Sequence, residues 1–237
     1  MNATDTDIKT RETIKKLEAM SDPSNKDGMA RFGINVSNAL CISMPALRKL
    51  AKETGKDHAL ALALWKTGIH EARILAALVD DPEQVTEAQM DHWVAGFDSW
   101  DVCDGCRSGL FDKTKFAYDK CFEWSRDERE FVKRAGYTMM ATLAVHDKKA
   151  DDTAFRRFFP DILRGSTDER NFVRKAVNWA LRQIGKRNPK LRRAAITTAR
   201  RIRKLDTRAA RWIAADALRE LTSRSLPDRK IRAPARK

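Results

Sequence analysis

Long apolar runs are missing from this 237-residue sequence. None reaches the roughly 18 to 20 residues that a membrane-spanning helix requires. The first twenty residues, MNATDTDIKTRETIKKLEAM, also lack the apolar core of a secretory signal peptide. Glycine is scarce, with ten residues, and no glycine-rich phosphate loop is present. We therefore expect a cytoplasmic protein with no membrane partner, and the hydrophobic content of 42% is enough for a folded core.

Cysteine and histidine are also few, with four residues of each. Cys103-x-x-Cys106 is a single pair without a second CxxC or an HxxxH. A zinc site or a redox pair stays open, but two half-buried free thiols on adjacent helix turns are the favoured interpretation. The histidines show no metal-ligand spacing, and no Ser-His-Asp or Cys-His arrangement is visible. We expect no metal and no cofactor. Besides Cys103 and Cys106, the cysteines and histidines are Cys41, Cys121, His58, His70, His92 and His146.

Acidic residues are scarce in the last third of the chain. Residues 171–237 hold 21 Lys and Arg against 4 Asp and Glu, a balance of +17, whereas residues 1–170 hold 26 against 29, a balance of −3. Such a concentration of positive charge indicates a polyanionic partner, with nucleic acid as the leading candidate. A solvated basic surface with a disordered tail is the alternative. The helix-like segment NPKLRRAAITTARRIRKL carries much of the excess, so the tail alone does not account for it.

Alternation of the kind that predicts β-strands is absent, and helical periodicity dominates. Short polar turns separate the periodic segments, and Asp81-Pro82 and Asn188-Pro189 suit helix starts or stops. These patterns predict an all-α fold. Apolar residues recur at i, i+3, i+4 and i+7 in DHALALALWKTG, IHEARILAALVDD, FVKRAGYTMMATLAVHD, FVRKAVNWALRQIGK and TRAARWIAADALRELT.

Two segments of the sequence repeat each other. SRDEREFVKRA (125–135) and STDERNFVRKA (166–176) match at a spacing of 41 residues. A period near 40 that holds two helices is typical of HEAT or armadillo repeats. We predict a curved, HEAT-like helical repeat solenoid with a concave basic groove. A single repeat domain is expected over 1–221, followed by a basic, disordered tail over 222–237.

The segment SWDVCD (99–104) places a large aromatic and a carboxylate one helical turn apart, at Trp100 and Asp104. Under the 41-residue shift Arg134 is equivalent to Lys175, and Trp179 lies one turn beyond Lys175. Trp100, Asp104, Arg134 and Trp179 are therefore predicted to share one wall of the array.

Plainer interpretations apply to the same residues. A tryptophan usually packs in a core, and Asp104 suits a surface pair with Arg107. Asp101 is a competing carboxylate that also suits helix capping or solvent, and Asp98 or Ser99 could cap the same helix. Apolar helical surroundings assign four tryptophans to packing or to helix interfaces: Trp65, Trp93, Trp124 and Trp212.

Several strings together resemble the bacterial DNA alkylation repair family of the AlkD type, which are HEAT-like-repeat DNA glycosylases. The resemblance runs from about Met29 to about Leu221. The family pattern of a Trp, an Asp four residues later, an Arg in the following repeat and a second Trp is matched by Trp100, Asp104, Arg134 and Trp179. The strings are MARFGINVSNALCISMPALRKLAKE (29–53), FDSWDVCD (97–104), EFVKRAGYTMMATLAVHDK (130–148) and NFVRKAVNWALRQIGKRNP (171–189).

The resemblance implies a monomer that removes N3- and N7-alkylated purines from double-stranded DNA without a cofactor. Asp104 would stabilise an oxocarbenium-like sugar and orient a water. Arg134 would assist that carboxylate or hold a phosphate, and Trp100 and Trp179 would present π-faces to the sugar and the cationic base.

Repeat position and charge assign the phosphate contacts. The alternatives are a non-catalytic HEAT-repeat scaffold that binds nucleic acid, and a protein-binding solenoid with an acidic partner on 171–220. The expected DNA-binding residues are Lys133, Arg174, Lys175, Arg182, Lys186 and Arg187.

Overall fold

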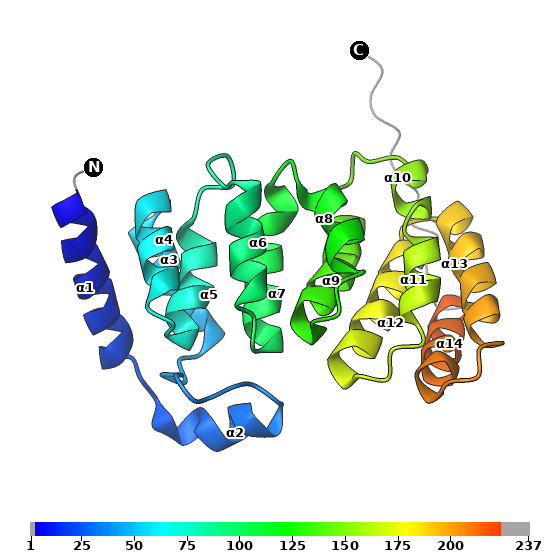
Figure 1. Cartoon of the computed structure of the whole chain (residues 1–237), viewed down its shortest axis with the longest axis horizontal. Helices are drawn as coiled ribbons and strands as arrows, with labels where there is room; N and C mark the ends of the chain where they lie inside the picture. Colours follow the sequence, from blue (N-terminus) through cyan, green and yellow to red (C-terminus); the bar gives the residue numbers. More distant parts are fainter. Residues whose placement is uncertain (1–2, 224–237) are drawn as a thin grey trace, which may run out of the picture. The chain divides into compact units, whose positions relative to one another are not determined.

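The computed structural model describes residues 3–223, which contain helices and turns but no β-strand (Figure 1). The all-α prediction is confirmed. The helices cluster into two compact units, unit 1 (Met1–Phe116) and unit 2 (Ala117–Lys237). The single repeat domain expected over 1–221 stays a prediction, as do the curvature and the concave groove.

Unit 1 is built from two layers of helices. Helices α3, α5 and α7 pack in succession in one layer, while α4 packs against α5 and α1 against α4 (Figure 1). Trp65 and Trp93 stack with their ring centroids 4.3 Å apart, so their assignment to packing is confirmed. The helices are α1 (Ala3–Ala19), α2 (Lys26–Arg31), α3 (Met44–Thr54), α4 (His58–Lys66), α5 (His70–Val79), α6 (Glu87–Ala95) and α7 (Trp100–Gly109), with short 3-10 turns at Pro23–Asn25 and Phe111–Lys113.

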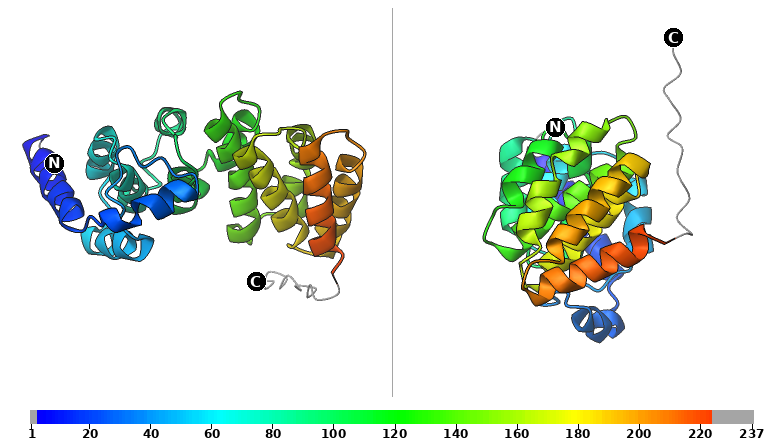
Figure 2. Two further views of the ribbon diagram at one scale, coloured as in Figure 1. Left: turned by 90° about the horizontal axis from the view of Figure 1, so that it is seen from below. Right: turned by 90° about the vertical axis from the view of Figure 1, so that its right-hand side faces the viewer.

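Unit 2 repeats this construction. Helices α9, α12 and α14 pack in succession, and α13 lies beside both α12 and α14 (Figure 2). The predicted neighbours near 130–146 and 171–187 are α9 and α12, which pack against each other more extensively than any other pair. The helices are α8 (Ala117–Trp124), α9 (Glu130–His146), α10 (Asp152–Arg156), α11 (Phe159–Gly165), α12 (Asn171–Gly185), α13 (Pro189–Ile202) and α14 (Arg208–Leu221).

The repeated Asp-Glu-Arg sequence forms the same structure twice. Asp127 accepts hydrogen bonds from the backbone N–H and the guanidinium of Arg129, immediately before α9. Asp168 accepts the same set from Arg170, immediately before α12. Arg170 Nη1 also donates to Glu128 O over 2.7 Å, which joins the second loop to the first. The repeat is therefore a repeat of loop structure as well as of helix pattern.

A glycine permits the close approach of α8 and α9. A Cβ atom added at Gly136 would lie 2.4 Å from the backbone nitrogen of Ser125, a separation that no side chain allows.

The Asn188-Pro189 pair begins α13, as the sequence predicts. The Asn188 side chain accepts from Leu191 N and so caps the helix, and Pro189 lies in its first turn.

All four cysteines are free and buried. Cys103 and Cys106 are 0% exposed on α7, so the expectation that they are half-buried is wrong. They lie on the side of α7 that packs in the core, and burial raises the pKa of the Cys106 thiol. Within residues 3–223, no group of three or more His, Cys, Asp or Glu side chains is placed to hold a metal ion.

The C-terminal part of the prediction is only partly covered. Helix α14 ends at Leu221, where the repeat domain is expected to end, and residues 224–237 of the predicted tail lie outside the described residues. Among the helices that the structure describes, none is both long enough and apolar enough to cross a membrane.

Candidate functional site

Helix α7 divides its residues between core and solvent. Val102, Cys103 and Cys106 are buried, whereas Trp100 and Asp104 are partly exposed. The two exposed residues are at i and i+4, so they lie one above the other on the same side of the helix. Helical packing of unit 1 thus presents an aromatic ring and a carboxylate side by side, as the sequence predicts.

The indole of Trp100 is held by the segment that precedes α3. Its Nε1–H donates to Phe32 O over 3.0 Å. Asn35 crosses the start of α7, donating its amide to Asp98 over 2.9 Å and its backbone N–H to Ser99 Oγ. Of the two caps considered, Asp98 and Ser99, it is Ser99 that occupies the N-cap position, although its side chain makes no cap hydrogen bond. The Phe32 side chain is 73% exposed beside this segment.

Asp104 has a cationic neighbour on its own helix, Arg107. Arg107 Nη2 lies 3.8 Å from Asp104 Oδ2, and the Arg107 side chain is largely buried. The surface pair considered from the sequence therefore exists, with a buried rather than an exposed arginine. About a quarter of the Asp104 side chain, 26%, faces solvent, which leaves this carboxylate accessible to a ligand.

Asp101 is not a solvent or capping carboxylate, contrary to the sequence-based interpretation. Its Oδ2 lies 2.8 Å from Nε2 of His70, whose side chain is 5% exposed at the start of α5. Burial acts to lower the pKa of His70, but the hydrogen bond and charge of Asp101 outweigh it and raise that pKa. Burial likewise acts to raise the pKa of Asp101, and the contact with His70 outweighs it and lowers that pKa. Asp101 and His70 form a buried ion pair that ties α5 to α7.

In unit 2 the structure buries Arg134. The residue is 7% exposed, and its Nη1 donates to Phe172 O over 3.0 Å at the start of α12. Lys133 lies 3.5 Å from Asp168 and is therefore paired with the loop before α12. Arg134 is buried, whereas its repeat equivalent on α12, Lys175, is exposed.

Helix α12 carries the more exposed members of the predicted site. Lys175 is exposed, and Trp179 one turn later is half-buried. With its amide oxygen directed at the indole, Gln183 accepts from Trp179 Nε1 over 2.8 Å. Lys175, Trp179 and Gln183 therefore form one stripe along α12.

Two of the predicted phosphate ligands pair with acidic residues of α14. Arg182 Nη1 lies 2.5 Å from Glu220 Oε2, and Lys186 Nζ lies 2.7 Å from Glu220 Oε1. Arg182 also lies 3.5 Å from Asp216, which accepts from the Asn178 amide. Burial acts to raise the pKa of Glu220, but its contacts with Lys186 and Arg182 outweigh it and lower that pKa. These cations are partly neutralised, which reduces what they offer to DNA.

The Arg187 side chain is held by contacts within unit 2. Its guanidinium lies 3.9 Å from the centre of the Phe155 ring and donates to the backbone at the end of α9. Three hydrogen bonds at one guanidinium leave few N–H groups for a phosphate. The acceptors are the carbonyl oxygens of Ala144, Asp147 and Ala150, at 2.9, 2.7 and 3.1 Å.

Trp212 is expected to pack in the core or at a helix interface, and it lies at the contact of α14 with α12. It is 38% exposed on α14, and the Arg174 guanidinium lies 5.2 Å from its ring centre. The buried series of α14 runs from Ala210 at i, i+3, i+4, i+7 and i+11, and Trp212 lies beside this series, so it is partly exposed. That spacing was visible in the sequence. The buried residues are Ala209, Ala210, Ile213, Ala214, Ala217 and Leu221.

The four predicted catalytic residues are therefore distributed over both units. Unit 1 brings Trp100 and Asp104 together on α7, and unit 2 places Arg134 on α9 next to the start of α12, which carries Trp179. The convergence of all four on one wall stays a prediction.

Comparison with known proteins gives one family and one fold. The model of the family described as DNA alkylation repair enzyme matches residues 13–221. A solved structure described as "a new family of proteins related to the HEAT-like repeat DNA glycosylases with affinity for branched DNA structures" aligns with a TM-score of 0.70 at 19% identity, covering 89% of this chain and 94% of that one. The HEAT-like repeat fold is confirmed. No curated protein matches the chain.

Proposed function

The chain belongs to the DNA alkylation repair enzyme family, and from this premise we propose that it excises cationic N3- and N7-alkylated purines from duplex DNA. The reaction would be hydrolysis of the N-glycosidic bond. The observation that carries the proposal is the pair of Trp100 and Asp104 on the exposed side of α7, one turn apart and flanked by buried residues.

The chemistry of the substrate explains why a carboxylate is enough. A purine alkylated at N3 or N7 is positively charged, so it leaves without being protonated by the enzyme. As the glycosidic bond lengthens, the deoxyribose acquires oxocarbenium-like positive charge, as in glycoside hydrolysis. A carboxylate near C1′ stabilises this charge and orients the attacking water. Asp104 is accessible, and Arg107 keeps positive charge at its inner side.

Trp100 would bind the same cation through its π-face. The hydrogen bond to Phe32 O fixes the indole of Trp100, which lowers the entropy lost when a ligand binds. A desolvated cation–π contact contributes about 2 kcal/mol. Trp179, whose indole is held by Gln183, is the second tryptophan of the family pattern. Arg134 is the cation that this pattern adds. These contacts support the carboxylate and do not replace it.

Binding to DNA would rest mainly on unit 2. Lys175 is exposed, and Arg174 with Trp212 presents a cation and an aromatic ring together at the surface of α12 and α14. Lys133, Arg182 and Lys186 would contribute less, since each has a carboxylate partner. Arg187 is left out of the proposed contacts because its guanidinium binds backbone carbonyls. Contacts of this kind are with phosphates and make affinity depend strongly on salt.

A second function is favoured by one specific observation. The solved structure with the same fold belongs to proteins described as having affinity for branched DNA. A non-catalytic protein that binds branched DNA would keep the basic surface of unit 2 and would need no accessible carboxylate at Asp104.

One experiment separates the two functions. Duplex DNA treated with a methylating agent is incubated with the full chain, and released 7-methylguanine and 3-methyladenine are measured. Excision predicts release of both bases above the spontaneous rate. Affinity for a four-way junction well above that for a linear duplex, with no base released, would instead establish the binding function and end the glycosylase proposal.

A further inference from the structure

We propose that a basic pocket in unit 1, between the C-terminal ends of α3 and α5, binds a backbone phosphate of DNA. The pocket has a volume of about 290 Å³. The proposal rests on the proposed function in one respect only, that the ligand is DNA. Its lining residues are Arg48, Ala51, Lys52, Gly55, Lys56 and Leu78.

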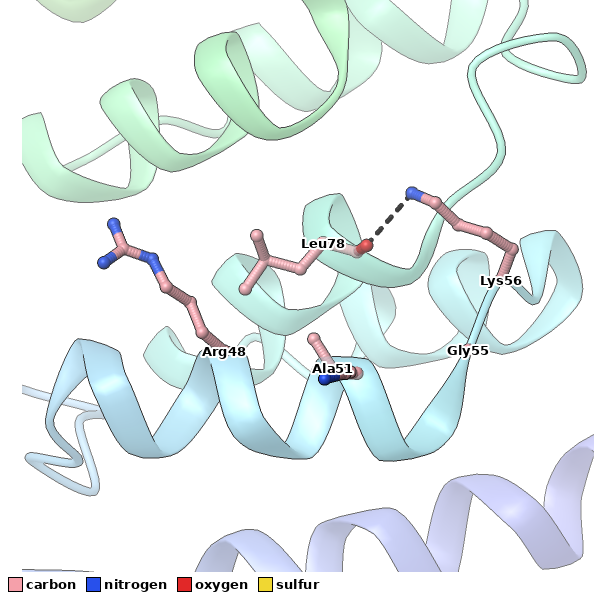
Figure 3. Close-up of a pocket in the computed structure, with 6 residues that line it drawn as sticks. Arg48, Ala51, Gly55, Lys56 and Leu78 are labelled. Carbon is pink, nitrogen blue, oxygen red and sulfur yellow. Dashed lines mark hydrogen bonds between the residues drawn. The ribbon is translucent and has the colours of Figure 1, made fainter.

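Three of the lining side chains are cations. Arg48 and Lys52 are at i and i+4 on α3, so they extend from the same side of that helix. Figure 3 shows Arg48 on the side of α3 that faces Leu78, with Lys56 at the far end of the pocket. The floor between them is apolar, formed by Ala51 and Leu78. Cations around a shallow apolar floor suit a phosphate and its sugar.

Lys56 has a structural role that also fixes its position. Its Nζ donates to Leu78 O over 3.1 Å (Figure 3). It also donates to Asp80 O over 2.6 Å, just after the end of α5. Burial and the nearby charge of Lys113 lower the pKa of Lys56. An anion placed in the pocket would relieve this repulsion between two cations.

Arg48 and Lys52 have no such role. Within residues 3–223 neither side chain makes a hydrogen bond or an ion pair, and both are exposed. Their donors are therefore available, and a guanidinium next to an ammonium matches the geometry of a phosphate.

The carboxylates near the pocket have other partners. Asp80 is buried, and its oxygens lie 2.6 Å from His58 Nδ1 and 2.6 Å from Gln89 Nε2. Asp81 accepts hydrogen bonds from Gln84 and from Glu83 N. The pocket is thus a local basic site, although unit 1 as a whole holds 15 Lys and Arg against 18 Asp and Glu.

Size and chemistry together identify the ligand class. A volume of about 290 Å³ is at the lower end for ligand pockets, which are typically about 300 to 1,000 Å³. It accommodates one phosphate group with part of its sugar. In a protein of a DNA repair family, the DNA backbone supplies that group, and the contact would position unit 1 on the duplex without reading its sequence.

The test compares two double variants of the full chain that remove the same charge. Arg48→Ala with Lys52→Ala removes the two cationic side chains that are available to bind a phosphate in the pocket. Lys49→Ala with Lys66→Ala removes two exposed cations from α3 and α4 that do not line it. Binding to a linear duplex is measured by fluorescence anisotropy at several salt concentrations, after equal melting temperatures confirm that both variants fold.

We expect the pocket variant to bind roughly tenfold more weakly. Its slope of log K against log[salt] should become shallower by about 0.9, the value for one phosphate contact. The control variant should stay near the wild type. Equal affinities of the two double variants would overturn the proposal, even if the wild type excises alkylpurines. A selective loss in the pocket variant would support it, even if no base is released and the glycosylase proposal fails.

Discussion

Unit 1 and unit 2 are built in the same way but carry opposite charge. Each has a succession of packed helices, α3, α5 and α7 in one and α9, α12 and α14 in the other, with further helices behind them. Unit 1 has a balance of −3, with 15 Lys and Arg against 18 Asp and Glu, and unit 2 has a balance of +17, with 32 against 15.

This difference shows that the fold does not determine the electrostatics. The apolar residues that pack each layer are similar, so the exposed positions are free to differ. In unit 1 the exposed side of α7 carries Asp104, and an ion pair of His70 with Asp101 lies behind it. In unit 2, α12 carries the exposed Lys175 and the partly exposed Arg182. The carboxylate proposed to stabilise a cation is therefore in unit 1, and most of the positive charge that attracts a polyanion is in unit 2.

The largest effect should come from the carboxylate of unit 1. Asp104→Asn keeps the size of the side chain and removes its charge, so the rate of 7-methylguanine release should fall by a factor on the order of 10² to 10³. Affinity for undamaged duplex should stay level or rise, because a negative charge facing DNA is lost. Single-turnover kinetics at saturating enzyme measure the rate, and anisotropy measures affinity.

Asp98→Asn is the matched control for Asp104→Asn. It removes an exposed carboxylate from the same segment, and an asparagine there can still accept from Asn35. Release should remain near the wild-type rate. If Asp98→Asn and Asp104→Asn slow release equally, the effect belongs to the charge of the segment and the assignment of Asp104 is wrong.

The next effect tests the ion pair behind that surface. Asp101→Asn should lower the free energy of unfolding by about 3 kcal/mol, the lower end for breaking a buried pair. Because the pKa of His70 is raised in the folded protein, protonated His70 stabilises the fold fully below pH 6.5. This stabilisation is lost as the pH rises through the higher pKa of the folded state. Because the pKa of Asp101 is lowered in the folded protein, its carboxylate stabilises the fold fully above pH 3.8. This stabilisation is lost as the pH falls through the lower pKa of the folded state.

The stabilisation by this pair is therefore largest between pH 3.8 and 6.5. Urea unfolding of the wild type and Asp101→Asn at pH 5 and at pH 9 measures the difference. The two proteins should differ more at pH 5 than at pH 9. The same difference at both values would show that Asp101 stabilises the fold without its charge.

The smallest effect should come from unit 2. Lys175→Ala removes one exposed cation from α12, so the slope of log K against log[salt] should become shallower by about 0.9 with little change in the excision rate at saturation. Lys149→Ala removes an equal charge beyond the C-terminal end of α9 and should leave the slope unchanged. If the two variants behave alike, unit 2 attracts DNA through its net charge and not through a contact at Lys175.

Much of the fold could be predicted from the sequence, because helical periodicity and the 41-residue repeat are local patterns. The pairing of Trp100 with Asp104 on one exposed face follows from the same periodicity. The contact of His70 with Asp101 could not be predicted, since it joins two helices through side chains 31 residues apart. Arg187 is a similar case, because only the structure shows that its guanidinium donates to backbone carbonyls in the last turn of α9 and in the loop after it.

The loops before α9 and α12 determine how local unfolding would spread through unit 2. Arg170 is held by Asp168 in its own loop and donates to Glu128 O in the preceding one, and Glu169 accepts from Ala209 N at the start of α14. These hydrogen bonds link each loop to the next one along the chain. Opening of one loop would be transmitted to its immediate neighbours first, so that unit 2 should unfold from its ends in steps of one repeat.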